Sequence, residues 1–287
     1  MKKNALIQVI IVVFAFMGML ASCKKTASES NKIDFNSIVV VKKIPMLVEN
    51  DTTLPFADVE IDFTYPVKFR NEEDLARLQQ IFLGTFFGER VYDSMTPEQA
   101  VDNYLTNYTE EYTSLSNSYY EDKARLGAND TPQWYWYNMS NSNKILFQND
   151  SLLAYAVEFS DYTGGAHGSY RVTYTNIDLN DLVTLSEEDI FKPDYYKPLT
   201  DKIVNALMKK FDAPVPDSLL MHGFFTVEDI VPNNNFWLDD KGIHYAYNQY
   251  EIAPYAMGVI EVSVPYSDLQ DILIPDGIVS RFFLKEN

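Results

Sequence analysis

The sequence contains very little cysteine and histidine. One cysteine, Cys23, and three histidines occur in 287 residues. A single cysteine cannot form a disulfide within the chain, so the fold must be stable through core packing alone. The histidines, His167, His222 and His244, are far apart in the sequence, and no His-Glu-x-x-His run accompanies them. We therefore expect neither a metal site nor a cofactor.

The sequence also lacks the short motifs that mark common catalytic sites. It has no Gly-x-Ser-x-Gly elbow, no phosphate-binding P-loop and no dinucleotide fingerprint. Paired carboxylates such as Asp239-Asp240 are frequent, but an acidic chain contains such pairs by composition, so they do not indicate a glycosidase. No set of residues supplies the roles of nucleophile, base and oxyanion donor together, which favours a role other than catalysis.

Basic residues are in deficit. The chain has 23 Lys and Arg against 41 Asp and Glu, a net charge of -18. This excess of acid argues against nucleic acid or an anionic membrane surface as a partner. It permits a basic protein, an amine-bearing glycan or a cation.

Residues 1–22 have the layout of a bacterial lipoprotein signal peptide. Lys2 and Lys3 precede an apolar run that is too short for a comfortable transmembrane helix, and small residues lead to Cys23. The alternative is a free, buried cysteine at the end of a membrane anchor. A lipid on Cys23 would hold the protein on a membrane of the cell envelope, facing the periplasm or the cell surface, with residues 23–34 as a flexible polar tether.

The spacing of apolar residues predicts both strands and helices. Residues 58–67 alternate between apolar and polar, which is typical of a strand with one wet face. Helix-start signals occur at Asn71 and at Thr96-Pro97-Glu98-Gln99. Tyrosines recur at helical spacing after the second signal, which fits a core stripe or a platform for stacking on sugar rings. We expect an α+β protein with a mainly antiparallel sheet and helices on one side.

A glycine-rich loop joins two strand-like runs near the middle of the chain. It reads Asp161-Tyr162-Thr163-Gly164-Gly165-Ala166-His167-Gly168. Because glycine tolerates positive φ and close approach of other groups, the loop is predicted to be a tight connection. Two interpretations of His167 stay open. The imidazole bonds the backbone or a nearby carboxylate in a structural turn, or it contacts a ligand or acts in catalysis with Asp161.

Three blocks resemble a known pair of extracytoplasmic domains. They are Tyr162 to Gly168, Asp178 to Phe191 and Asn248 to Gly258. The chain resembles the paired domains of unknown function that occur in a lysozyme-sensing anti-sigma factor and beside the catalytic domain of peptidoglycan deacetylases. The resemblance spans nearly all of the chain after Cys23 and implies two adjoining subdomains, for which we take residues 35–168 and 169–287.

The resemblance implies a non-catalytic protein of the cell envelope whose ligand is a lysozyme-like muramidase or peptidoglycan. We expect neither the sigma-binding segment and transmembrane helix of the sensor nor the catalytic domain of the deacetylases. The predicted ligand contacts lie in the two loops named above: Tyr162, Gly164, Gly165, His167, Tyr250 and Tyr255. Two alternatives are a hydrolase or deacetylase-like enzyme that uses His167 and Asp161, and a structural component of the envelope.

Overall fold

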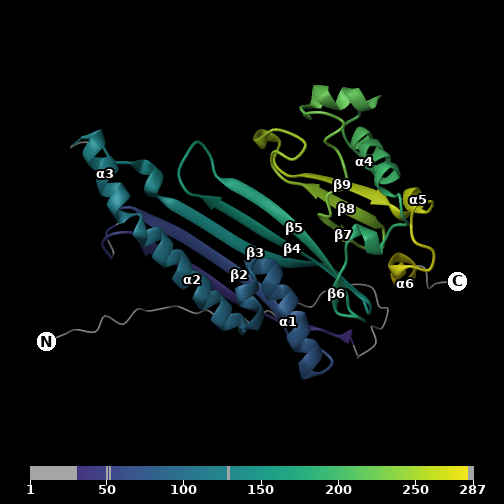
Figure 1. The fold of residues 1–287 in the computed structure, drawn as a ribbon, viewed down its shortest axis with the longest axis horizontal. Helices are drawn as coiled ribbons and strands as arrows, with labels where there is room; N and C mark the ends of the chain where they lie inside the picture. The colour runs from purple at the N-terminus through teal and green to yellow at the C-terminus, as the bar shows by residue number, and fades with distance from the viewer. Residues whose placement is uncertain (1–30, 50, 52, 128–129, 284–287) are drawn as a thin grey trace.

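The protein contains two β-sheets, with helices packed against each (Figure 1). The structure is a computed structural model that describes residues 31–49, 51, 53–127 and 130–283, except for the side chains of residues 281–283. The large sheet has six strands in the order β1 (Asp34–Pro45), β2 (Phe56–Lys68), β3 (Tyr137–Gln148), β4 (Leu152–Tyr162), β5 (Ser169–Asp178) and β6 (Val183–Thr184). The small sheet has the order β7 (Phe236–Leu238), β8 (Gly242–Tyr247) and β9 (Ile260–Pro265).

All neighbouring strands are antiparallel except β2 and β3, which pair in parallel. A parallel pair needs a long crossover. That crossover holds α1 (Glu72–Phe87), η2 (Arg90–Ser94), α2 (Pro97–Ser114), α3 (Ser116–Leu126) and η3 (Gln133–Tyr135). The predicted α+β class with a mainly antiparallel sheet is confirmed, and the parallel pair is an addition to it.

The crossover helices begin where the sequence signals predicted. The Asn71 side chain accepts hydrogen bonds from the N–H groups of Glu73 and Asp74 at the start of α1, and α1 ends at Gly88 with φ 75°. Thr96 forms a capping box with Gln99 at the start of α2. These contacts satisfy N–H groups that have no partner within the helix.

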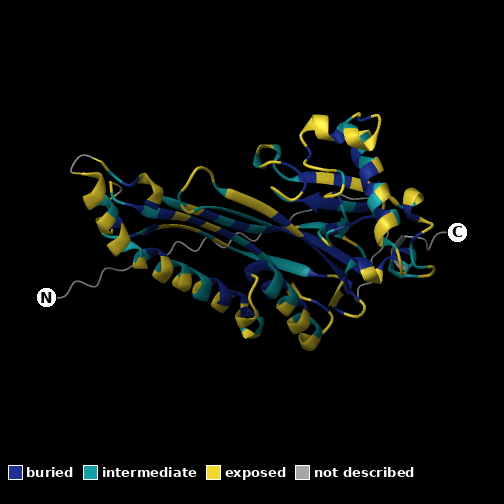
Figure 2. Ribbon diagram, turned by 45° about the horizontal axis from the view of Figure 1, so that its top comes forward, coloured by how far each residue is buried: buried dark blue, intermediate teal, exposed yellow. Residues whose placement is uncertain are grey.

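The core of the large sheet lies between its strands and the crossover helices. Alternate residues of β2 such as Phe63 are buried there, and the ring of Phe82 from α1 stacks on Tyr155 at 4.4 Å between centroids. Figure 2 shows the outward sides of α1 and α2 exposed and the strands beneath them buried. The tyrosines of α2 join this core, since Tyr112 is buried and Tyr104 is partly buried against it. They therefore form a core stripe rather than a sugar platform.

The small sheet has its own core. Buried residues of α4 (Tyr196–Lys210) pack with residues of β8 and β9 in one hydrophobic cluster. The remaining elements of this part are η4 (Glu187–Asp189), η5 (Pro216–His222), η6 (Tyr255–Met257), α5 (Tyr266–Leu269) and α6 (Ile278–Phe283). β7 and β8 form an antiparallel hairpin.

Side-chain amides join the small sheet to the free edge of β5. The Val172 N–H donates to Asn248 Oδ1 at 2.8 Å, and the Tyr174 N–H donates to Asn235 Oδ1 at 2.8 Å. The Tyr170 N–H donates to Gln249 Oε1 at 3.1 Å. An uncovered edge strand exposes unpaired backbone groups, so these amides complete the edge of the sheet.

The predicted division between residues 35–168 and 169–287 falls in the turn between β4 and β5. β5 pairs with β4 from Ser169 to Asp178, and the small sheet covers its other edge. β5 thus belongs to the large sheet and is also the strand on which the small sheet docks.

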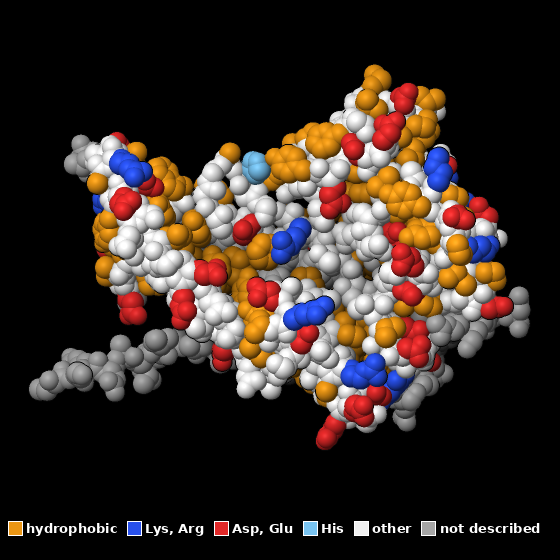
Figure 3. All heavy atoms as spheres, in the orientation of Figure 1, with side chains coloured by type: hydrophobic (Ala, Val, Ile, Leu, Met, Phe, Trp, Pro, Cys, Tyr) orange, Lys and Arg blue, Asp and Glu red, His pale blue; other side chains and the backbone are white. Residues whose placement is uncertain are grey.

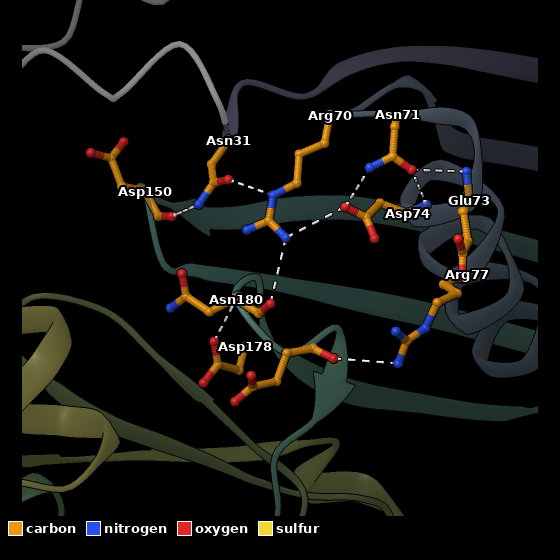
Figure 4. A network of polar contacts seen from close by, with 10 residues as sticks. Asn31, Arg70, Asn71, Glu73, Asp74, Arg77, Asp150, Asp178 and Asn180 are labelled. Atoms are coloured by element: carbon orange, nitrogen blue, oxygen red, sulfur yellow. Dashed lines mark hydrogen bonds and ion pairs between the residues drawn. The ribbon is translucent and has the colours of Figure 1, made fainter.

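The folded chain begins slightly before the predicted start. Asn31 is buried, and its side chain accepts a hydrogen bond from Arg70 Nε at 2.7 Å and donates to the Asp150 carbonyl. Arg70 also reaches Asp74 and the carbonyl of Asn180 (Figure 4). This network ties the first described residues to three turns of the large sheet.

Within the described ranges, no helix is long and apolar enough to cross a membrane. The predicted signal peptide of residues 1–22, the lipidation of Cys23 and most of the predicted tether lie outside these ranges.

Candidate functional site

Two loops that are far apart in the sequence meet at one aromatic cluster, formed by His167, Tyr250 and Tyr255. The His167 ring stacks on Tyr255 with 3.8 Å between centroids and 24° between planes. Tyr250 lies 6.3 Å from His167 and 6.0 Å from Tyr255, again between ring centroids. Its hydroxyl is 3.3 Å from His167 Nε2. The structure thus brings together three of the six predicted contact residues.

The glycine loop holds His167 through its backbone. Gly164 and Gly165 have φ angles of 89° and 110°, which residues with a Cβ rarely adopt. Tyr162 donates its hydroxyl to the Gly165 carbonyl at 3.0 Å, so these three predicted contacts shape the loop rather than join the cluster. His167 Nδ1 is 3.0 Å from the Gly168 carbonyl, which can only accept, so Nδ1 carries the proton.

The loop that carries Tyr250 is anchored to β5. The adjacent Asn248 and Gln249 use their side chains to bind the β5 backbone, which begins just after the glycine loop. Tyr250 has a φ of 69°, unusual for a residue other than glycine, and the residue is 57% exposed. Strained backbone that the surroundings hold in place is frequent at functional sites. The cluster is therefore preorganised and open to solvent.

A catalytic histidine needs a carboxylate that binds its ring, but Asp161 has a different hydrogen-bond partner. Asp161 accepts a hydrogen bond from the Ser169 hydroxyl. The ring nitrogens of His167 face the Gly168 carbonyl and the Tyr250 hydroxyl. In this arrangement Asp161 does not orient the imidazole, and the backbone contact agrees with the structural interpretation of His167. The residue is nevertheless exposed to solvent, apart from its contact with Tyr255.

A second polar chain lies on the small sheet and was not foreseen from the sequence. His244 Nδ1 is 2.7 Å from Ser263 Oγ, and His244 Nε2 is 3.1 Å from Asp239 Oδ1. Trp237 stacks on the His244 ring at 4.1 Å. A pocket of about 130 Å³ that includes Tyr174 lies beside these residues. His244 and Ser263 are cross-strand partners in β8 and β9. Their contact could be predicted only from the register of these strands, which the sequence alone does not give.

This Ser-His-Asp order does not by itself make a hydrolase. Catalytic triads present the serine beside oxyanion donors, often on a sharp turn, whereas Ser263 lies within β9. Asp239 Oδ1 also accepts the N–H groups of Lys241 at 2.7 Å and Gly242 at 3.0 Å. We assign the chain of contacts to stabilisation of the turn between β7 and β8.

Asp239 is expected to make stability depend on pH in the acid range. Burial raises its pKa, but hydrogen bonds from His244 and from the Lys241 and Gly242 N–H groups outweigh burial and lower the pKa overall. A carboxyl whose pKa is lower in the folded state stabilises above its unfolded pKa and loses this contribution as pH falls. Between about pH 5 and about pH 2, wild type should lose more unfolding free energy than Asp239→Asn in urea titrations. Parallel losses in both proteins would contradict this role.

Among the described residues, no group of three or more His, Cys, Asp or Glu side chains could hold a metal ion.

Comparisons with known proteins cover both parts of the chain. A family model described as Protein of unknown function (DUF3298) matches residues 188–267, and one described as Deacetylase PdaC matches residues 57–170. These matches agree with the paired domains that the sequence resembles. Among curated proteins, no match to this chain is found.

Two solved structures are similar to the whole fold. A DUF3298 family member from Bacteroides fragilis is 33% identical, with a TM-score of 0.81, over 88% of this chain and 98% of that chain. A DUF3298 family protein from Pseudomonas aeruginosa is 15% identical, with a TM-score of 0.59, over 86% of this chain and 97% of that chain. The second likeness shows the fold alone. With one-third identity over nearly the full length of the first, the chain belongs to the DUF3298 family.

Proposed function

We propose that the protein is a non-catalytic binding protein of the cell envelope that contacts its ligand through the aromatic cluster. The observation that carries the proposal is the meeting of His167, Tyr250 and Tyr255 from two anchored loops, with Tyr250 largely exposed. Rigid aromatic side chains supply large contact area at a low cost in conformational entropy. The DUF3298 and PdaC matches support an envelope protein. The lipid on Cys23 that would hold it there is part of this proposal and rests on the sequence of residues 1–23.

The ligand that we propose is a lysozyme-like muramidase. The net charge of -18 favours encounter with a basic protein. Figure 3 shows acidic side chains scattered over one face of the molecule rather than gathered in one patch. Diffuse charge of this kind attracts any cation, so specific recognition needs the aromatic cluster. Peptidoglycan, the other ligand that the resemblance suggests, is tested in parallel.

The aromatic cluster is expected to determine affinity at physiological ionic strength, where charges are screened beyond about 8 Å. In calorimetry with a c-type lysozyme and with soluble peptidoglycan fragments, Tyr250→Ala and His167→Ala should weaken binding about tenfold or more. Tyr120→Ala is the matched control, since Tyr120 is a tyrosine of α3 with 56% exposure. It should bind as wild type does.

The outcomes separate the competing explanations. Binding that disappears at this ionic strength, or that cytochrome c matches, would reduce the interaction to nonspecific charge attraction. Binding of the fragments without lysozyme would identify the glycan as the ligand. Unchanged affinity in both cluster variants, with folding intact, would remove the cluster from the binding surface.

A further inference from the structure

The two edges of the large sheet differ in how their backbone groups are covered. At one end, amide side chains cover β5 and β6 pairs with its last residues. At the other end lies β1, a strand of 12 residues that pairs with β2 without a bulge from Phe35 to Pro45. Among the residues that the structure describes, none bonds to the outer backbone edge of β1. Within the described part of the chain, the edge of β1 is therefore open to another strand.

The residues of β1 favour pairing rather than prevent it. Its centre is Ile38-Val39-Val40-Val41, four β-branched residues, and Val41 is 78% exposed. Proteins usually protect an open edge with an internal proline, a bulge or several charges. Here the bulge lies at the first residue and the proline at the last. Lys43 bonds Asp58 at 2.7 Å, and Asp34 lies 3.8 Å from the exposed Lys32. Lys42 has no ion pair with any residue that the structure describes.

We infer that β1 pairs antiparallel with β1 of a second copy, so that the two large sheets become one continuous sheet. A two-fold axis perpendicular to the sheet places the same face of both copies on the same side of the joined sheet. Because residues directly opposite each other in an antiparallel pair point to the same face, one residue must then lie on the axis, opposite its own copy. Of the registers centred on Ile38, Val39 and Val40, the one centred on Ile38 places Lys42 opposite an acid. That acid is Asp34 of the second copy.

The same register gives the exposed Val41 an aromatic partner. With Ile38 on the axis, Val41 lies opposite Phe35 of the second copy, and the Lys42 and Asp34 pair forms twice. Opposite charges directly across a strand pair stabilise it, and β-branched residues opposite aromatic ones do so too. Because strand pairing alone gives an interface at or below the standard size, the dimer should be weak and should dissociate on dilution.

A charge-swap cycle tests the pairing on the full chain. Sedimentation would be measured over a range of concentrations in a non-denaturing detergent whose density the buffer matches. Lys42→Asp and Asp34→Lys should each raise the dimer dissociation constant about tenfold or more, and the double variant should restore it to within about threefold. Lys197→Asp is the control for net charge, since Lys197 is 80% exposed on α4, away from β1. Circular dichroism checks the folding of each variant.

The cycle gives a clear result in either direction. A wild type that stays monomeric up to the highest soluble concentration would overturn the proposal. A dimer whose dissociation constant does not respond to either single swap would place the interface elsewhere and overturn it equally. Weakening in both single variants without recovery in the double variant would reject the Ile38 register.

Discussion

Replacing Asn176 by leucine is expected to lower the free energy of unfolding by about 2 to 4 kcal/mol. Asn176 is 2% exposed and lies on the face of β5 against the small sheet. Its Nδ2 donates to the Phe236 carbonyl at 2.8 Å, and its Oδ1 accepts the Leu238 N–H at 2.9 Å. Leucine has a similar volume but cannot bond, so two buried groups of β7 would lose their partners, at about 1 to 3 kcal/mol each.

Urea unfolding followed by tryptophan fluorescence would measure the loss, since Trp237 lies in β7 between the two partners of Asn176. Thr173→Leu is the matched control because Thr173 is an exposed residue of the same strand. It should change the unfolding free energy by no more than about 0.5 kcal/mol. A similarly small change in Asn176→Leu would show that water or a backbone shift replaces the amide, and that the docking of the small sheet does not depend on Asn176.

The sequence predicted those elements whose signals are local. The side chains of Asn71 and Thr96 bond backbone groups two or three residues away, so the starts of α1 and α2 follow from short stretches. The period-two pattern of β2 also sufficed to predict its buried face. The parallel pairing of β2 with β3 was not predicted, because it joins segments separated by the whole helical crossover.

The candidate site was predicted as a set of residues but not as an arrangement. The composition of the two loops drew attention to His167, Tyr250 and Tyr255, which are up to 88 positions apart. Their contact depends on the side chains of Asn248 and Gln249 binding β5, and no local pattern encodes such pairing. The Asp239, His244 and Ser263 contacts were missed for the same reason, since they require the register of β8 and β9.

Replacing Gly164 by alanine is expected to cost about 2 to 4 kcal/mol of stability, more than the same change at Gly165. Both residues have positive φ, so alanine is strained at either position. Gly164 has a second restriction: an added Cβ would lie 2.5 Å from the carbonyl oxygen of Trp134, whereas nothing lies within 4 Å of a Cβ at Gly165. Gly165→Ala should therefore show only the strain in φ, about 1 to 2 kcal/mol.

The difference between the two glycines tests how the loop is held. Trp134 belongs to η3, just before β3, so the close approach of Gly164 packs the loop against the end of the helical crossover. Because His167 follows three residues later, displacement of the loop should also separate His167 from Tyr255 and weaken ligand binding in Gly164→Ala more than in Gly165→Ala. Urea unfolding and the same calorimetry would measure both effects. Equal and small changes in the two variants would mean that the loop moves freely, and a cluster built on a freely moving loop would not be preorganised for a ligand.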